Sequence, residues 1–225
     1  MVGAILTNAS PVDLTMVTPI ARLTGEQEAV VVPAASPLKT MADLVAALKA
    51  DPGAVSWGGG SAGGTDHILA GLIAKAASVD PTKVNYIAFS GGGEALAAIL
   101  GGQVTVGVSG YGEFQSQVEA GELRVLAVSG EERMAGVEAP TLREAGVDVA
   151  LENWRMVAAA PGLTPEQTAA ITADIEKMAT SEPWKKALAD RGWIDSFLAG
   201  EAFQTQLAAD IAATSEILKA IGLVQ

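Results

Sequence analysis

Two glycine-rich turns constrain this chain most, because each follows a short apolar run and precedes a helical stretch. The first turn follows Trp57 and holds five glycines within residues 58–64. The second turn, residues 90–93, has the sequence Ser-Gly-Gly-Gly and is followed by Glu94. Glycine permits positive φ and lets a ligand approach the backbone closely. Each pattern predicts a strand, Ala54 to Trp57 or Asn85 to Phe89, that turns directly into a helix.

A turn of this kind favours the binding of an anion. The first turn of a helix has free N–H groups and lies at the positive end of the helix dipole. In the first pattern Ser61, Thr65 and Asp66 are residues that cap helix N-termini. Two consecutive strand–turn–helix units place two helix starts at the carboxyl edge of one sheet, where open α/β sheets bind ligands. The pair predicts a cleft for a small molecule that carries a carboxylate.

Two other interpretations of these turns stay open. Residues 58–63 match the dinucleotide fingerprint GxGxxG, but the acidic residue expected about twenty positions further on is missing. A phosphate-binding GxxxxGK[ST] loop is absent as well. A small α/β enzyme that binds a nucleotide or phosphate is therefore the alternative function. A flexible turn that only permits tight packing is the third interpretation.

Composition excludes several classes of protein. A net charge of −12 over 225 residues argues against nucleic acid or an anionic membrane surface as a partner. The sequence has no cysteine and one histidine, His67, so disulfides, thiolate sites and His-rich metal sites are excluded. We expect His67 to be structural, because no GxSxG nucleophile motif accompanies it. The sequence predicts no catalytic residue, no metal and no cofactor, and its first residues lack the basic region of a signal peptide.

Strand and helix patterns alternate up to about residue 153, which predicts a mostly parallel sheet covered on both faces. Residues 17–23 and 28–33 are predicted as separate strands, the first broken near Pro19. A helix is predicted after Thr40, with Asp43 in the capping-box position. Further strands are expected at residues 104–109, 123–129 and 154–160, and further helices at residues 114–120 and 140–146. The remainder of the chain is mainly helical, with helices that begin at Thr164, Pro183 and Glu201 and a short strand at residues 193–197.

This organisation predicts two domains. Residues 34–153 form an α/β domain, and residues 1–33 together with 154–225 form the other. Two extended segments, 29–32 and 157–160, would connect them. Such a two-strand connection is typical of a hinge that closes on a ligand.

An ordered set of motifs resembles the substrate-binding proteins of tripartite tricarboxylate transporters, the Bug-type receptors. Each motif is weak alone, but together they follow the family order over nearly the whole chain. They are Pro33-Ala-Ala-Ser-Pro-Leu-Lys-Thr-Met-Ala-Asp-Leu44, residues 59–67, Ser90-Gly-Gly-Gly-Glu-Ala95, Gly101-Gly-Gln-Val104, residues 120–127, Glu132-Arg133, residues 139–146, Asn153-Trp154 and Ala160-Pro-Gly-Leu-Thr-Pro165.

The resemblance implies a type II periplasmic-binding-protein fold with a complete domain two, a partial domain one and a two-strand hinge. It also implies a periplasmic, non-catalytic receptor that delivers a di- or tricarboxylate-like solute to the membrane components of a tripartite transporter. The residues that it implies for ligand binding are Gly59, Gly60, Ser61, Gly63, Gly64, Thr65, Ser90, Gly91, Gly92, Gly93, Ser109, Gly110 and Trp154.

The sequence departs from the family pattern in three places. Gly59 stands where the family often has serine, and Met156 stands where glycine is common. The first strand-and-helix units of domain one have no counterpart, so we expect a fragment, a late start or a naturally shortened relative. We also expect the incomplete domain one to associate with a second copy. Arg155 is expected either to pair with a ligand carboxylate or to lie at the surface. The carboxylates of Asp66 and Glu94 are expected to interact with the positive ends of their helix dipoles and not to act as catalysts.

Overall fold

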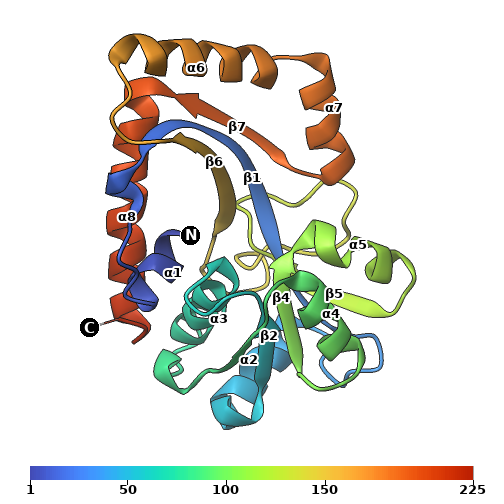
Figure 1. Cartoon of the computed structure of the whole chain (residues 1–225). Helices are drawn as coiled ribbons and strands as arrows, with labels where there is room; N and C mark the ends of the chain where they lie inside the picture. The colour runs from blue at the N-terminus through green and yellow to red at the C-terminus, as the bar shows by residue number, and fades with distance from the viewer. Residues whose placement is uncertain (225) are drawn as a thin grey trace.

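One long strand, β1 (Thr18–Pro33), passes through the whole molecule (Figure 1). The computed structural model describes residues 1–224. The first part of β1 pairs antiparallel with β6 (Glu152–Ala159) on one side and with β7 (Ile194–Ala199) on the other. We call the region around β6 and β7 the upper lobe, following its place in Figure 1.

The second part of β1 belongs to the sheet of the lower lobe. From Glu28 onward β1 pairs antiparallel with β4 (Val106–Gly110), and from Ala29 with β5 (Leu123–Val128). Strands β2 (Ser56–Gly59) and β3 (Asn85–Ala88) complete this sheet in the order β3-β2-β4-β1-β5. Strands β2, β3 and β4 are parallel. The prediction of a mostly parallel sheet is confirmed, with β1 as the antiparallel strand.

Helices cover both faces of the lower sheet. Side chains of α2 (Met41–Ala50) and α3 (Thr65–Ala76) pack with Val30 and Val32 on one face. Side chains of α4 (Gly92–Leu100) and α5 (Tyr111–Glu119) pack with Ala29 and Val31 on the other. The alternation along β1 follows from the two-residue period of a strand. Trp57 is fully buried in the first of these cores, so it cannot stack on a ligand there.

The upper lobe is mainly helical, as the sequence predicts. Phe203 and Leu207 form its buried core with Leu14, and Trp154 and Met156 pack against them. Helix α8 (Gly200–Ala220) runs beside the upper lobe and continues down to α3 (Figure 1). The helices of this part are α1 (Val2–Thr7), α6 (Pro165–Ala179), α7 (Glu182–Arg191) and α8 (Gly200–Ala220). Short 3-10 turns at Leu14–Met16, Pro52–Ala54 and Pro81–Lys83 precede β1, β2 and β3, respectively.

Local helix signals are confirmed at two N-termini. The Thr40 hydroxyl accepts from the Asp43 N–H, and the Asp43 carboxylate accepts from the Thr40 N–H, which is a capping box. Thr164 and Gln167 form the same reciprocal pair before α6. Each box satisfies N–H groups that the first turn of a helix leaves free. The start of α3 differs, because its N-cap is Gly64 and no side chain caps it.

Two predicted elements need correction. Residues 17–23 and 28–33 form one strand and not two, since Pro19 lies beside a register shift that interrupts the ladder without ending β1. Residues 140–146 form turns and not a helix. There the Glu144 carboxylate accepts from the Thr141 N–H, and Gly146 at φ 85° reverses the chain after a single turn.

The connections between the lobes also differ from the predicted segments 29–32 and 157–160. The partners of β1 change between Gln27 and Glu28, and β6 begins at Glu152. We call the region around Gln27, Glu28 and Glu152, where the two lobes join, the waist. Both connections lie there and not in the segments that the sequence predicted. The division into residues 34–153 and the two flanking segments stays a prediction, because both lobes share β1.

Candidate functional site

Both glycine-rich turns lie at one edge of the lower sheet. We call residues 59–65 the first elbow and residues 90–93 the second elbow. Strands β2 and β3 are parallel neighbours, so both elbows follow strand ends at the same edge. Helices α3 and α4 then pass to opposite faces of the sheet. Ser109 and Gly110, at the end of β4, lie buried at this edge as well.

The first elbow uses several of its N–H groups within the chain. Gly60 N–H donates to the Asp66 carboxylate at 2.7 Å, and Gly63 N–H donates to His67 Nδ1 at 3.2 Å. Gly64 N–H donates to the carbonyl of Ser61 at 2.9 Å. The expected cradle of free N–H groups is therefore partly closed, and Asp66 bonds the elbow instead of capping α3. Ligand binding by Gly59 to Thr65 stays a prediction.

His67 and Tyr86 stack on each other and bond the backbone of the first elbow. Their rings are parallel with centroids 4.1 Å apart, and the Tyr86 hydroxyl donates to the Gly60 carbonyl at 2.8 Å. Burial lowers the pKa of His67, which keeps the ring neutral and able to accept the Gly63 N–H. These contacts give His67 a structural role.

The second elbow is more open. Ser90 N–H donates to the Glu94 carboxylate at 3.1 Å, and a side chain added at Gly91 or Gly93 would meet nothing within 4 Å. Gly92 lies against the Glu113 carboxylate. Neither of the two cavities described below is lined by residues 90–93. Binding at Ser90, Gly91, Gly92 and Gly93 also stays a prediction.

A cavity of about 490 Å³ lies between the two lobes. This volume is within the range of small-molecule sites. The predicted residues Gly63, Gly64, Thr65 and Trp154 line it. The Thr65 hydroxyl donates to Asn153 Oδ1 at 3.3 Å across the cavity wall. Arg155, for which the sequence allowed a ligand contact or a surface position, lines the cavity as well. Sequence reasoning missed the other lining residues, which are Met1, Val2, Gly3, Leu14, Ile68, Leu151, Glu152, Asn153, Met156, Thr214 and Ile217.

A second cavity, of about 640 Å³, lies elsewhere, and none of the predicted site residues lines it. Its walls come from α5, β5 and the segment 134–139, with residues of α7. The interlobe cavity is therefore the one that contains predicted residues from both sides of the waist.

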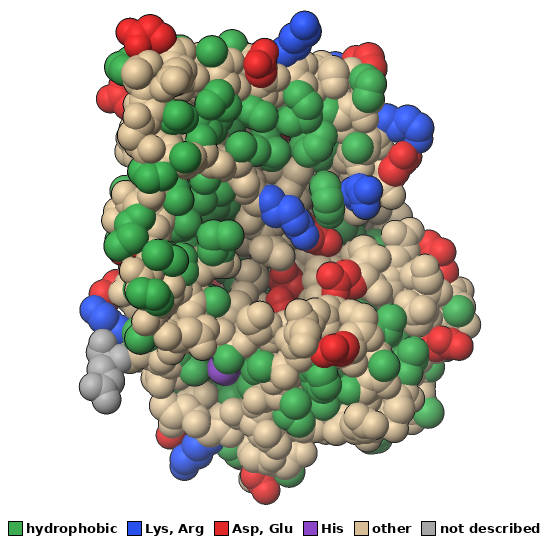
Figure 2. Space-filling model, in the orientation of Figure 1, with side chains coloured by type: hydrophobic (Ala, Val, Ile, Leu, Met, Phe, Trp, Pro, Cys, Tyr) green, Lys and Arg blue, Asp and Glu red, His purple; other side chains and the backbone are tan. Residues whose placement is uncertain are grey.

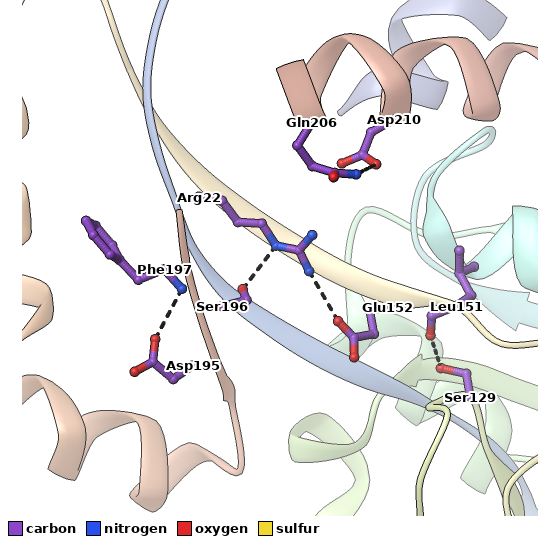
Figure 3. A network of polar contacts seen from close by, with 9 residues as sticks. All are labelled: Arg22, Ser129, Leu151, Glu152, Asp195, Ser196, Phe197, Gln206 and Asp210. Atoms are coloured by element: carbon purple, nitrogen blue, oxygen red, sulfur yellow. Dashed lines mark hydrogen bonds and ion pairs between the residues drawn. The ribbon is translucent and has the colours of Figure 1, made fainter. Parts of the chain in front are cut away.

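Polar contacts near the waist link β1 to both β6 and β7 (Figure 3). Arg22 donates to Ser196 at 3.0 Å and to the Glu152 carboxylate at 3.2 Å, and its guanidinium lies 5.8 Å from the Trp154 ring. Ser129 donates to the Leu151 carbonyl just before β6, and its hydroxyl accepts from the N–H of Glu28 on β1. Trp154 lines the cavity and also packs in the upper lobe, and its contact with a ligand stays a prediction.

Four carboxylates lie close to one another near the end of β4 and the start of α3, and we call them the acid cluster, although none of them lines the cavity. They are Glu26, Glu28, Asp66 and Glu113. Arg155 binds Glu26 at 2.5 Å and lies 4.7 Å from the Trp193 ring, so the structure pairs Arg155 with a protein carboxylate. Ser109 donates to Glu113 at 2.9 Å, and Glu26 lies over Gly110. Figure 2 shows acidic and basic side chains together in the hollow between the lobes.

Burial controls the chemistry of this cluster. It raises the pKa of Glu28 well above its ordinary value of 4.5, and the neighbouring charges of Asp66, Glu26 and Glu113 raise it further. Burial likewise raises the pKa of Asp66, against the Gly60 N–H that favours its charged form. Within residues 1–224 no three acidic or histidine side chains are placed to hold a metal ion. None of the helices described there is long and apolar enough to span a bilayer.

The fold and the interlobe cavity define a periplasmic-binding-protein type of molecule. The chain belongs to the Tripartite tricarboxylate transporter family receptor family, whose model matches residues 6–223. The resemblance that the motifs indicated is therefore confirmed.

Individual relatives agree with this assignment. The chain is similar to a UPF0065 protein of Cupriavidus necator, 27% identical over 92% of this chain and 62% of that protein. It thus spans about three fifths of the length of that relative. A TctC solute binding protein from Polaromonas is 29% identical, with a TM-score of 0.73 over 97% of this chain and 74% of that one. An R. palustris protein solved with adipate shares the fold at a TM-score of 0.84 and 22% identity, over 94% and 71% of the two chains.

Proposed function

We propose that this chain is a receptor that captures a small di- or tricarboxylate-like solute in the periplasm and delivers it to the membrane components of a tripartite transporter. The observation that carries the proposal is a cavity between two lobes in a chain of this receptor family, with the start of α3 in its wall. The positive end of a helix dipole favours a carboxylate at that place. The same fold holds adipate in the R. palustris protein.

A thermal-shift screen separates this proposal from the alternative of a nucleotide- or phosphate-binding enzyme. A ligand that binds only the folded state raises the melting temperature. We expect di- and tricarboxylates to raise it and nucleotides to leave it unchanged. Stabilisation by nucleotides alone would favour the enzyme and overturn the receptor.

Thr65→Val tests the place of binding. The change removes the cavity hydroxyl but keeps the shape of the side chain. A lost neutral hydrogen bond should weaken carboxylate binding roughly twofold to tenfold in calorimetric titration. Thr172→Val is the matched control, because the Thr172 hydroxyl bonds its own helix at Thr168. Equal affinities in both variants would remove Thr65 from the site.

The proposal includes association of two copies through the upper lobe. Among the described residues β6 pairs with β1 alone, which leaves one edge of β6 unpaired. Unpaired strand edges pair readily with other chains. Apolar side chains also gather over the concave face of the upper lobe (Figure 2). Light scattering that finds only a monodisperse monomer would refute this association.

A further inference from the structure

Glu28 lies where β1 passes from one lobe to the other, and its carboxylate has no hydrogen-bond donor. Gln27 is the last residue of β1 that pairs with β6, and Glu28 is the first that pairs with β4. The exposed fraction of Glu28 is 0%, and neither of its carboxylate oxygens has a partner within residues 1–224. Since native proteins satisfy almost all buried polar groups, an ionised carboxylate at this place is strongly unfavourable.

Acidic side chains of both lobes face Glu28. Alternate residues of a strand share a face, so Glu26 and Glu28 lie on the same face of β1 as Val30, which shares a core with side chains of α3. Asp66 of α3 and Glu113 of α5 belong to the lower lobe, whereas Glu26 belongs to the part of β1 that pairs with β6. Burial raises the pKa of Glu28, and the charges of these three acids raise it further.

Glu26 and Arg155 reach across the junction between the lobes. Arg155 of β6 binds the Glu26 carboxylate, which lies over Gly110 at the end of β4. Arg155 is also the one cation among the charged groups that act on the pKa of Glu28. The upper lobe therefore covers the acids of the lower lobe with a carboxylate that a single guanidinium compensates. These acidic and basic side chains lie in the hollow that Figure 2 shows.

The remaining titratable groups nearby supply no second cation. Tyr86 of β3 stays neutral, because burial and the charges of Asp66 and Glu28 raise its pKa, and its hydroxyl bonds the first elbow. His67 stacks on Tyr86, and burial lowers its pKa, which disfavours the charged ring. The negative charge of an ionised Glu28 thus stays poorly compensated while the lobes are together.

Separation of the lobes relieves this charge. It moves Glu26 away from Asp66 and Glu113 and lets water reach the Glu28 carboxylate. In the closed arrangement, by which we mean the lobes as they lie in Figure 1, burial holds the pKa of Glu28 well above 4.5, whereas a hydrated glutamate titrates near that value. The closed arrangement is therefore fully favoured below about pH 4.5 and loses this advantage as pH rises through the raised pKa.

We propose that Glu28 is a pH-sensitive latch between the lobes, which holds them together when it is protonated and drives them apart when it is ionised. Between the pKa of the hydrated side chain and that of the closed arrangement, the ratio of closed to open molecules falls about tenfold for each pH unit. Two-lobed proteins commonly open about such a hinge. The latch needs no ligand, so it stands or falls independently of the receptor proposal.

A distance between the lobes tests the latch directly. The sequence has no cysteine, so two introduced cysteines can be spin-labelled selectively. Lys49→Cys on α2 and Glu176→Cys on α6 replace exposed residues on helices at the bottom and the top of Figure 1. Pulsed electron paramagnetic resonance then gives the distance between the labels. We expect one short distance at about pH 5 and a longer one that gains population towards about pH 8. Distances that do not change with pH overturn the latch.

Glu28→Gln in the labelled chain keeps the shape of the side chain and removes its charge. We expect the short distance to persist at about pH 8 in this variant. Glu122→Gln, at an exposed position before β5, is the matched control and should open as the parent does. His67 is present in both variants, so its own titration cancels in the comparison. If Glu28→Gln opens like the control, with its fold intact by circular dichroism, the latch is overturned.

Arg155→Gln makes the opposite prediction and does not depend on how well Glu28→Gln folds. Without Arg155 the charge of Glu26 faces the acids of the lower lobe uncompensated. We therefore expect the longer distance to appear at a lower pH than in the parent. A transition that stays in place or moves to higher pH would show that the acids do not repel one another across the junction, and the latch would be overturned.

Discussion

Glu28 makes the stability of the molecule depend on pH in an unusual direction. The folded pKa of Glu28 lies well above the ordinary value of 4.5, which applies to the unfolded chain. A raised acid pKa gives stability that is fully present below the unfolded pKa and lost as pH rises through the folded pKa. Burial sets this direction for the pKa of Glu28, the charges of Asp66, Glu26 and Glu113 add to it, and the charge of Arg155 opposes it.

We therefore expect Glu28→Gln to be more stable than the wild type, by a margin that grows as pH rises from about 5 to about 8. Melting temperatures of both proteins at each pH measure this margin. The difference between the proteins is the useful quantity, because the lowered pKa of His67 acts in the opposite direction over the same range. A margin that is constant or shrinks with pH would show that Glu28 stays ionised in the folded state.

Gly59 gives a second prediction at the residue scale. A Cβ at this position would lie 2.5 Å from the Tyr86 hydroxyl and 2.7 Å from the Val108 carbonyl oxygen. The space that a serine would need is thus filled by Tyr86, which explains this departure from the family pattern. We expect Gly59→Ser to lower the free energy of unfolding by about 1–3 kcal/mol, the usual cost of overpacking.

Chemical denaturation measures this change, and Gly93→Ser is the control, since a Cβ at Gly93 meets nothing within 4 Å. If Gly59→Ser is as stable as its control, the first elbow can shift and the packing against Tyr86 does not fix it.

The capping boxes show which elements can be predicted from local sequence. We expect Thr40→Ala to lower the free energy of unfolding by about 1 kcal/mol, because the Asp43 N–H at the start of α2 loses its acceptor. Denaturation with urea gives the value. Thr205→Ala is the control, because the exposed Thr205 hydroxyl bonds only the Glu201 carbonyl of its own helix. A loss no larger than in the control would mean that tertiary contacts alone define this helix start.

Most elements were predictable because their signals are local. Capping residues, glycine and proline set the helix ends, and the β-branched residues 30–32 set the centre of β1. The helix expected at residues 140–146 was wrong because side-chain bonds of Glu144 favour a turn, which the pattern alone does not reveal. The continuity of β1 past Pro19 depends on pairing with β6 and β7, which lie far along the chain.

The candidate site was less predictable for the same reason. The glycine pattern located the first elbow correctly, but it did not show that Asp66 and His67 would take its N–H groups. Glu28 was visible only as the first residue of an apolar strand run. Two of its acidic neighbours, Asp66 and Glu113, come from α3 and α5, so the acid cluster forms only when the chain folds.

At the scale of the whole molecule, the lobes meet at a second place besides the strands of the waist. Leu218 and Ile221, at the end of α8 and just beyond it, pack with Ile68 of α3. Gly71 permits this contact, because a Cβ there would lie 2.9 Å from the Ile221 side chain. If the lobes separate to admit a ligand, this apolar contact has to open together with the cavity that Ile68 and Ile217 line.

Leu218→Ala tests that coupling. Leu218 is fully buried, so the change should lower the free energy of unfolding by about 2–5 kcal/mol, whereas Leu100→Ala, at a residue 42% exposed, should cost far less. Hydrogen exchange of the α3 amides should rise in Leu218→Ala, because the end of α8 covers α3. A stability loss without faster exchange in α3 would place the effect within the upper lobe. Faster exchange in α3 would identify the end of α8 as the contact that opposes separation of the lobes.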